Sequence, residues 1–239
     1  MKNTSSRLLE KYNSYRRRQT AEYPASRAVM FKSLRRTLGP WLPDANDSAI
    51  LDIACGEGTL LLFLREAGYT NLFGFDFSPE NVQIAHRLDL DFIELQDAFH
   101  IRDLYSPQTF DTIFLMDFLE HVPKEMAAPF LEDVTSKLKP GGIIILQTPN
   151  MGSIHGVYFR YNDLSHEFGF TESTIVDLLL MVGFDISCIE VKPSWNATTV
   201  LGRLREIYLR LLHFFVYLSE DSSRPNIPTK NLLIRARKS

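Results

Sequence analysis

Short apolar runs alternate with amphipathic segments along most of the chain. The runs contain few polar residues, as expected for strands that are covered on both faces. They predict strands over 49–54, 72–75, 91–95, 111–116 and 142–147. Between them, apolar residues recur at helical spacing and predict helices over 58–67, 79–88 and 123–138. This alternation predicts an α/β fold with a doubly wound sheet, whose ligands bind at the carboxyl ends of the strands.

The N-terminal segment predicts a helical cap that precedes one main domain. Residues 5–38 are expected to form helices that break near Pro24. Because 239 residues suit one domain with an appended cap, we expect a helical N-terminal cap over 1–40 and one main domain over 41–239.

Later segments of the main domain predict one more helix and one more strand. A helix over 171–182 starts with Thr171 and Glu172 and ends at Gly183, a helix-stop residue. An apolar strand pattern follows over 184–191.

Two segments depart from the alternation. Residues 149–170 are long, aromatic and polar, and they follow the carboxyl end of a strand, so they predict an active-site loop. Residues 196–220 form an insertion that holds an amphipathic helix over 199–218. Its apolar stripe predicts packing on the sheet or cap, a homodimer contact or a membrane-surface contact.

A glycine loop follows the first strand. Asp52 lies near the end of that strand, and Gly56 and Gly58 precede the next helix. Glycine leaves room for a tight turn and for close approach of a nucleotide-like cofactor to backbone N–H groups.

A second acid follows twenty positions after Gly56. Asp76 ends the next strand, where a carboxylate can accept hydrogen bonds from both hydroxyls of a ribose. Asp76 could instead cap the following helix, but Ser78 and Pro79 are the better N-cap and first-turn residues.

Together these residues resemble the class I S-adenosylmethionine (SAM) methyltransferases. The resemblance implies a Rossmann-like sheet with an antiparallel last strand near 231–237. It places the adenine-contacting acid at Asp97 and the fifth-strand motif at Leu138-Lys-Pro-Gly-Gly142. Nicotinamide dehydrogenases are the rival family, but Leu61 stands where their third glycine is needed. The expected cofactor is SAM, and the implied binding residues are Asp52, Ala54, Gly56, Gly58, Asp76, Phe77, Asp97, Ala98 and Met116.

Four polar residues are expected near the transferred methyl group. Asp117 closes the fourth strand, Glu120 and His121 follow within one helical turn, and His166 lies in the later loop. A general base must remove the proton of an alcohol acceptor, so His121, His166 and Asp117 are the candidate catalytic residues. Asp117, Glu120, His121 and His166 also form a candidate set of ligands for a divalent metal, Mg²⁺ or similar.

The same four positions resemble ubiquinone-biosynthesis O-methyltransferases and small-RNA 2′-O-methyltransferases, which carry an acid-x-x-Glu-His segment and a later histidine. Here Asp117 replaces their first glutamate. The segment 162–174 resembles methyltransferases of sugar and polysaccharide biosynthesis. We therefore expect O-methylation of a hydroxyl of a sugar or sugar-like small molecule. The alternatives are catechol or quinol O-methylation and a non-catalytic SAM-binding partner subunit.

Composition and charge bear on the class of substrate and on the cellular compartment. The net charge is −3, yet residues 1–40 hold ten Lys and Arg residues and two acids. Such a segment is usually a solvated helix face, but the helical spacing of Tyr12, Tyr15 and Arg27 predicts that it lies over the cofactor mouth. An anionic or nucleotide-linked sugar is one substrate that this charge would suit, and it would suit nucleic acid less well. No apolar run is long enough to span a membrane, and the N-terminus does not resemble a signal peptide. Two cysteines make no disulfide framework. These features predict a cytoplasmic enzyme.

Overall fold

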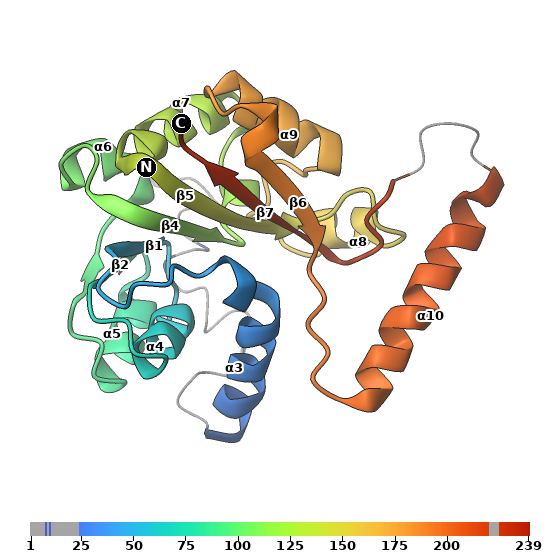
Figure 1. Ribbon diagram of the computed structural model, residues 1–239, viewed down its shortest axis with the longest axis horizontal. Helices are drawn as coiled ribbons and strands as arrows, with labels where there is room; N and C mark the ends of the chain where they lie inside the picture. The colour runs from blue at the N-terminus through green and yellow to red at the C-terminus, as the bar shows by residue number, and fades with distance from the viewer. Residues whose placement is uncertain (1–7, 9, 11–23, 220–224) are drawn as a thin grey trace.

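Seven strands form one mixed sheet at the centre of the molecule (Figure 1). The computed structural model describes residues 8, 10, 24–219 and 225–239. The strand order is β3-β2-β1-β4-β5-β7-β6. The strands are β1 (Ile50–Ile53), β2 (Leu72–Asp76), β3 (Ile93–Leu95), β4 (Phe110–Met116), β5 (Leu138–Pro149), β6 (Ile189–Pro193) and β7 (Asn231–Arg237). Strands β1 to β5 pair in parallel, whereas β7 runs antiparallel to both β5 and β6. The predicted Rossmann-like sheet with an antiparallel last strand is confirmed.

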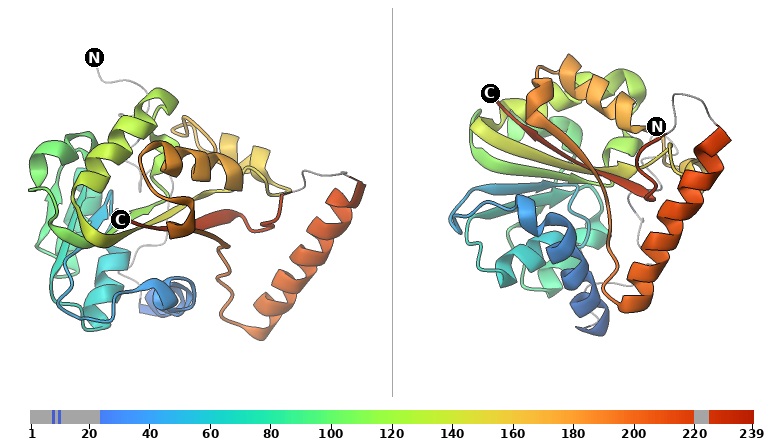
Figure 2. Two further views of the ribbon diagram at one scale, coloured as in Figure 1. Left: turned by 45° about the horizontal axis from the view of Figure 1, so that its top comes forward. Right: turned by 45° about the vertical axis from the view of Figure 1, so that its right-hand side comes forward.

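Helices cover both faces of this sheet (Figures 1 and 2). One face carries α3 (Pro24–Leu38), α4 (Thr59–Glu66) and α5 (Pro79–Arg87), and the other carries α6 (Ile101–Leu104), α7 (Lys124–Ser136) and α9 (Glu172–Met181). Alternate residues of one strand therefore enter different cores. In β1, Leu51 and Ile53 join the core under α7 and α9, whereas Ile50 joins the core under α3 and α4. Burial on both faces explains why the strands are apolar throughout.

Helix starts follow the local signals of the sequence. The Ser78 hydroxyl accepts a hydrogen bond from the Asn81 N–H and caps α5, with Pro79 in its first turn. Thr171 caps α9 through a reciprocal pair of hydrogen bonds with Thr174. Gly183 follows α9 with φ +95°, a conformation that favours glycine.

Several boundaries differ from expectation. Strand β5 begins at Leu138, within the range predicted for the preceding helix, because that helix ends at Ser136. Strand β6 begins at Ile189, because the Asp185 carboxylate accepts the Ser187 N–H and turns the preceding residues into a 3₁₀ helix, Ile186–Cys188. The predicted loop over 149–170 contains a short helix, α8 (Gly156–Tyr161), and β5 extends to Pro149.

The N-terminal cap is only partly described. Helix α3 packs on α4 through an edge contact between Phe31 and Phe63, with ring centroids 5.5 Å apart. The Glu10 carbonyl accepts a hydrogen bond of 2.8 Å from the Ser78 hydroxyl. Tyr12 and Tyr15, which we expected over the cofactor mouth, lie outside the described residues. Arg27, expected there with them, lies in α3 and does not line the cofactor pocket.

Helix α10 (Val200–Val216) stands beside the sheet rather than on it (Figure 2). The predicted packing of its apolar stripe on the sheet or cap is wrong, because Leu204, Tyr208 and Leu211 are each more than half exposed. Within the described residues, no helix combines the length and apolarity that crossing a membrane requires.

Candidate active site

A pocket of about 570 Å³ opens at the carboxyl ends of β1, β2 and β4. This is the edge where a doubly wound sheet presents its ligand site. Helix α3 contributes Met30 and Leu34 to one wall. Eight of the nine predicted cofactor residues line the pocket: Asp52, Ala54, Gly56, Asp76, Phe77, Asp97, Ala98 and Met116.

The loop after β1 is left-handed at three positions. Ala54, Gly56 and Gly58 have φ values of 56°, 58° and 78°. A Cβ on Gly56 would meet no atom within 4 Å, so the pocket is open above it. Gly58, the ninth predicted residue, does not line the pocket. A Cβ there would lie 2.6 Å from Leu90 and 2.7 Å from Ile93, so Gly58 permits the close packing beneath the loop.

Asp76 holds this loop to the end of β2. Its Oδ2 accepts the Gly56 N–H at 2.8 Å, and its Oδ1 accepts the Ser78 N–H and the Asn81 side-chain N–H, both at 2.9 Å. Burial raises the pKa of Asp76, and these three donors oppose the rise. The carboxylate is therefore a fixed acceptor at the pocket wall.

Asp52 is a second buried carboxyl in the same wall. It is 2% exposed, and its Oδ1 has no hydrogen-bond partner among the described residues. Burial, and then the charge of Asp76, raise the pKa of Asp52 well above its ordinary value. An unpaired buried acceptor at a pocket wall suits a ligand that brings a positive charge or a donor.

Asp97 lies at the far side of the pocket, after β3. Its Oδ1 accepts the Phe99 N–H at 3.0 Å and starts the 3₁₀ helix Ala98–His100. Both Asp97 and Ala98 face the pocket beside Phe77. An acceptor, a backbone amide and an aromatic ring thus lie along one wall.

A second pocket of about 280 Å³ adjoins the first, and Asp117 and His121 line both. Its other walls come from Pro149 at the end of β5, from α8 and the following loop, and from the start of β7. Polar groups dominate it. They are Asp117, Glu120, His121, Asn162, Asp163, His166, Lys230 and Asn231.

His121 and His166 meet in this second pocket with ring centroids 4.9 Å apart. The Nδ1 of His121 lies 3.2 Å from the Ser165 carbonyl, and the Nδ1 of His166 lies 3.0 Å from the Phe159 carbonyl. A carbonyl oxygen only accepts, so both Nδ1 atoms donate and Nε2 carries the lone pair of each neutral ring. Burial lowers the pKa of His166, which favours that neutral form.

The Glu120 carboxylate lies close to the donor atoms of both histidines, whereas the Asp117 carboxylate does not belong to this group. One donor atom each of Glu120, His121 and His166 lie within 4.8 Å of one another. Burial, and then the charge of Asp117, raise the pKa of Glu120 well above its ordinary value. Asp117 has φ 54° and turns toward β5 and β7, where it accepts from Gln147 at 2.9 Å and from Asn231 at 3.3 Å.

Sequence reasoning did not identify Lys230 and Asn231. Both line the second pocket, and Lys230 lies 4.9 Å over the Phe159 ring. The Oδ1 of Asn231 has no hydrogen-bond partner in the described part of the chain. A usable signal existed, because an antiparallel strand begins at the edge where its parallel neighbours end.

Known proteins match both the sequence and the fold. A family model described as a methyltransferase domain matches residues 14–197. A ubiquinone biosynthesis O-methyltransferase of Colwellia psychrerythraea is 34% identical over 108 residues, which are 44% of this chain and 43% of that relative. A tRNA U34 carboxymethyltransferase of Idiomarina loihiensis is 29% identical over 117 residues, 46% of this chain and 36% of the relative. The chain thus spans less than half the length of these curated relatives.

The fold comparison agrees with the family match. A SAM-dependent methyltransferase from Archaeoglobus fulgidus superposes with a TM-score of 0.67 at 20% identity, covering 91% of this chain and 97% of the other. The family model alone covers well over half of the 239 residues. The chain therefore belongs to the methyltransferase-domain family, and its fold is that of solved SAM-dependent methyltransferases.

Proposed function

We propose that this enzyme methylates a hydroxyl of a polar, sugar-like small molecule. The observation that carries the proposal is the pair of adjoining pockets that share Asp117 and His121. The larger pocket has the predicted cofactor residues, and the smaller one is lined mainly by polar side chains. A methyl donor in the first and an acceptor in the second would meet beside His121.

The larger pocket fits SAM. Asp76 is placed to accept hydrogen bonds from the ribose hydroxyls, and Asp97, Ala98 and Phe77 would hold the adenine. The unpaired Oδ1 of Asp52 suits the positively charged end of the cofactor. The remaining predicted contacts are Ala54, Gly56 and Met116, with Gly58 behind the loop. When bound, SAM supplies an electrophilic methyl group.

His121 is proposed to take the proton of the acceptor hydroxyl. Its Nδ1–H donates to the Ser165 carbonyl, which orients the ring and leaves Nε2 as the basic nitrogen. His166 packs edge-on against that ring and shares the site, so it limits how His121 can turn. Asp117 lies at the junction of the two pockets and places a negative charge near the imidazolium that would form.

Two buried acceptors favour a polyhydroxylated substrate over a catechol or quinol. The Oδ1 of Asn231 and the Oε2 of Glu120 lack hydrogen-bond partners among the described residues. The several hydroxyls of a sugar can donate to both acceptors while one hydroxyl is methylated. A catechol or quinol has two hydroxyls, and one of them gives up its proton in the reaction, so at least one acceptor stays unpaired at a cost of roughly 1–3 kcal/mol. Lys230 adds a positive charge that suits an anionic or nucleotide-linked sugar. The quinol alternative rests on the name of the Colwellia relative.

A divalent metal, Mg²⁺ or similar, is the second candidate feature of this site. Glu120, His121 and His166 offer three converging donors, a carboxylate and two imidazoles. A bound cation would favour the ionised form of Glu120 and could lower the pKa of an acceptor hydroxyl. Asp117, the fourth predicted ligand, lies outside this group.

A cytoplasmic setting is also proposed. It is supported by the two free thiols of Cys55 and Cys188, which suit a reducing compartment. Nucleic acid is not proposed as a substrate, although one relative carries a tRNA methyltransferase name. We keep the division into an N-terminal cap over 1–40 and a methyltransferase domain over 41–239 as part of the same proposal.

The test is a methyl-transfer screen with purified enzyme and SAM. Nucleotide sugars and free sugars form one arm, and catechols and quinols form the other. We expect turnover in the sugar arm, and a His121→Gln variant that binds SAM normally but turns over roughly 10²–10⁴-fold more slowly. Turnover in the catechol arm alone would contradict the sugar proposal. SAM binding without turnover in either arm would favour a non-catalytic partner subunit.

A further inference from the structure

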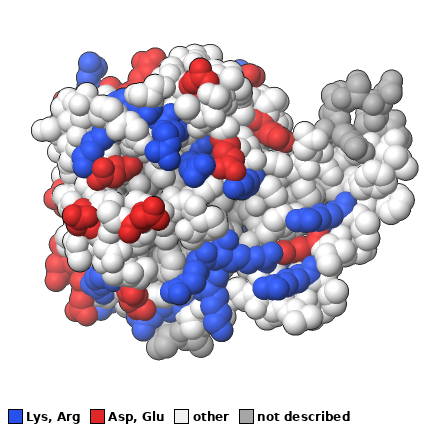
Figure 3. Space-filling view, viewed as in Figure 1, with Lys and Arg blue, Asp and Glu red and all other residues white. Residues whose placement is uncertain are grey.

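Helix α10 turns its apolar face away from the protein. Leu201, Leu204, Tyr208, Leu211 and Phe215 recur three and four positions apart, and their exposed fractions run from 53% to 78%. At 100° per residue they form one continuous stripe along the helix. The visible outer margin of α10 in Figure 3 shows neither basic nor acidic atoms. A helix that served the protein core would point this stripe inward.

The polar face of α10 points toward the body instead. Glu206 forms a two-pronged ion pair with Arg36 of α3, at 2.9 and 2.7 Å, and also accepts the Ala197 N–H at 2.9 Å. His213 is 6% exposed, and the Arg210 guanidinium lies 4.7 Å over the Trp195 ring. These contacts fix which face is outward, so the exposure of the apolar stripe is built into the fold.

We propose that this outward face of α10 docks on the surface of a lipid membrane that contains anionic lipids. An interfacial helix buries an apolar face at the boundary of the acyl chains while its charged residues reach the headgroups. Arg203 and Arg205 flank Leu204 in sequence, so at 100° per residue they lie on opposite edges of the apolar stripe. Both are exposed, and long basic side chains at such edges extend toward lipid phosphates.

The charge of α10 suits anionic lipid. The helix carries Arg203, Arg205 and Arg210, and its one acid, Glu206, is already paired with Arg36. The outward surface therefore combines apolar side chains with the positive charge of Arg203 and Arg205. This pairing is the signature of an interfacial helix.

A second copy of the chain fits this face less well. The regular apolar spacing from Leu201 to Phe215 covers about two heptads, fewer than the three or four that sustain a coiled coil. A 17-residue helix is about 25 Å long and about 10 Å wide. Contact through such a footprint alone is well below the roughly 800 Å² per partner of a stable interface.

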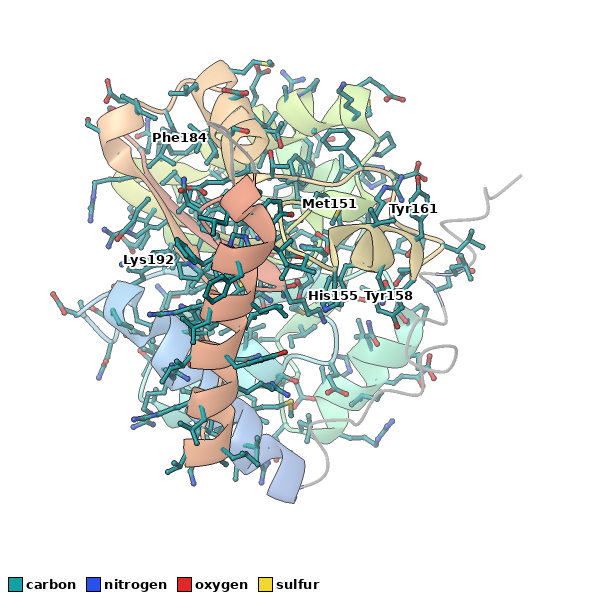
Figure 4. All side chains as sticks on the ribbon, turned by 90° about the vertical axis from the view of Figure 1, so that its right-hand side faces the viewer. Met151, His155, Tyr158, Tyr161, Phe184 and Lys192 are labelled. Carbon is teal, nitrogen blue, oxygen red and sulfur yellow. The ribbon has the colours of Figure 1, made fainter. Side chains whose placement is uncertain are left out.

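The proposed lipid contact lies near the acceptor pocket. The Tyr217 hydroxyl after α10 donates to the Gly152 carbonyl at 3.4 Å, just before α8. Helix α8 and the loop after it line the second pocket, and their Tyr158, Tyr161 and Leu164 are more than 60% exposed. Figure 4 shows α10 crossing in front of the body with Tyr158 and Tyr161 of α8 to one side. Docking would bring the enzyme's acceptor pocket close to the lipid surface.

Vesicle binding tests the proposal without SAM or acceptor, so its outcome is independent of the proposed function. The full chain is floated with vesicles of phosphatidylcholine and phosphatidylglycerol, and with phosphatidylcholine alone. We expect binding to the mixed vesicles that weakens with added salt. Leu204→Gln with Leu211→Gln should lower binding at least roughly tenfold. Arg203→Gln with Arg205→Gln should lower it roughly tenfold on anionic vesicles and little on neutral ones.

A matched control removes exposed apolar side chains elsewhere. Met181 and Ile186 are 70% and 61% exposed near α9, so Met181→Gln with Ile186→Gln should leave vesicle binding unchanged. SAM binding confirms that each variant is folded. The proposal is overturned if the native chain does not bind the mixed vesicles at low salt. It is equally overturned if the native chain sediments as a dimer that Leu204→Gln with Leu211→Gln converts to a monomer.

Discussion

The Oδ2 atom of Asp76 accepts a hydrogen bond of 2.8 Å from the backbone N–H of Gly56. This bond joins the end of β2 to the glycine loop after β1, so one carboxylate both faces the cofactor pocket and shapes the loop beside it. Asp76, which is predicted to contact ribose, therefore also stabilises the glycine loop when no ligand is bound.

Replacing Asp76 tests both roles. Asp76→Ala leaves the Gly56 and Ser78 N–H groups and the Asn81 amide without their acceptor, so we expect about 1–3 kcal/mol lower stability in urea unfolding. SAM affinity, measured by calorimetry, should fall at least tenfold, since a hydrogen bond to a charged group contributes roughly 1.5–3 kcal/mol. Unchanged affinity in a folded variant would refute the ribose assignment.

The pKa of Asp52 predicts how stability depends on pH. Because burial and the charge of Asp76 raise this pKa in the folded chain, the folded state holds the proton more tightly than the unfolded state. The contribution of Asp52 to stability is therefore complete below its unfolded pKa, near 4, and is lost as pH rises through the higher folded pKa. Asp52→Asn should flatten this fall and make the ligand-free protein more stable at neutral pH.

The affinity for SAM should depend on pH in the opposite direction to the stability, again through Asp52. A cationic ligand favours ionised Asp52, so binding should release protons and strengthen as pH rises through the raised pKa. Calorimetry in buffers of different ionisation enthalpy measures the released protons. Asp52→Asn should abolish the release and weaken SAM binding roughly tenfold or more. If proton release persists in the Asp52→Asn variant, the protons come from another group.

We expect the substitution Ala54→Gly to stabilise the protein. Its φ of 56° is left-handed, a region in which a Cβ costs roughly 1–2 kcal/mol. Glycine removes that cost but adds flexibility to the unfolded chain, so Ala54→Gly should raise the free energy of unfolding by up to about 1 kcal/mol. Thermal and urea unfolding measure the change. Gly56→Ala, at φ 58°, is the opposite control and should be destabilising.

The elements that the sequence predicted well are those set by local signals. Ser78 and Thr171 cap their helices through atoms within three residues, and the apolar strand runs are visible without knowledge of their neighbours. The parallel topology follows from the strand-helix alternation. The 3₁₀ helix before β6 is also set locally, because the Asp185 carboxylate accepts from the Ser187 N–H and hydroxyl, but the apolar pattern over 184–191 predicted a strand with which these hydrogen bonds compete.

The elements that it did not predict depend on distant contacts. An amphipathic pattern shows that α10 has two faces but not which one meets the body, and that orientation rests on the Arg36–Glu206 pair, 170 positions apart. The antiparallel last strand was expected from the family resemblance, but the entry of Asn231 into the second pocket depends on the register of β7 against β5, which no local signal contains. Asp117 lines the same pocket as the histidines, as expected, but its carboxylate accepts hydrogen bonds from Gln147 and Asn231 and lies outside the group of Glu120, His121 and His166 donors.

Replacing Glu120 distinguishes a metal-free mechanism from a metal-assisted one. Burial and the charge of Asp117 raise the pKa of Glu120, which favours its neutral form, and a neutral glutamic acid resembles glutamine in shape and charge. If His121 acts as a base without a metal, Glu120→Gln should therefore keep kcat within about threefold, far less than the roughly 10²–10⁴-fold loss expected for His121→Gln. Activity of the native enzyme should then survive chelation with EDTA.

A metal at Glu120, His121 and His166 would give a different set of results. Chelation would abolish activity and a divalent ion would restore it, and Glu120→Gln would lose metal and turnover together, because a neutral amide is a far weaker ligand than a carboxylate. Direct metal analysis of the native and Glu120→Gln proteins provides the readout that does not depend on turnover. We expect equal, near-zero metal content in both, and retained metal in the native protein alone would assign the metal role to this cluster.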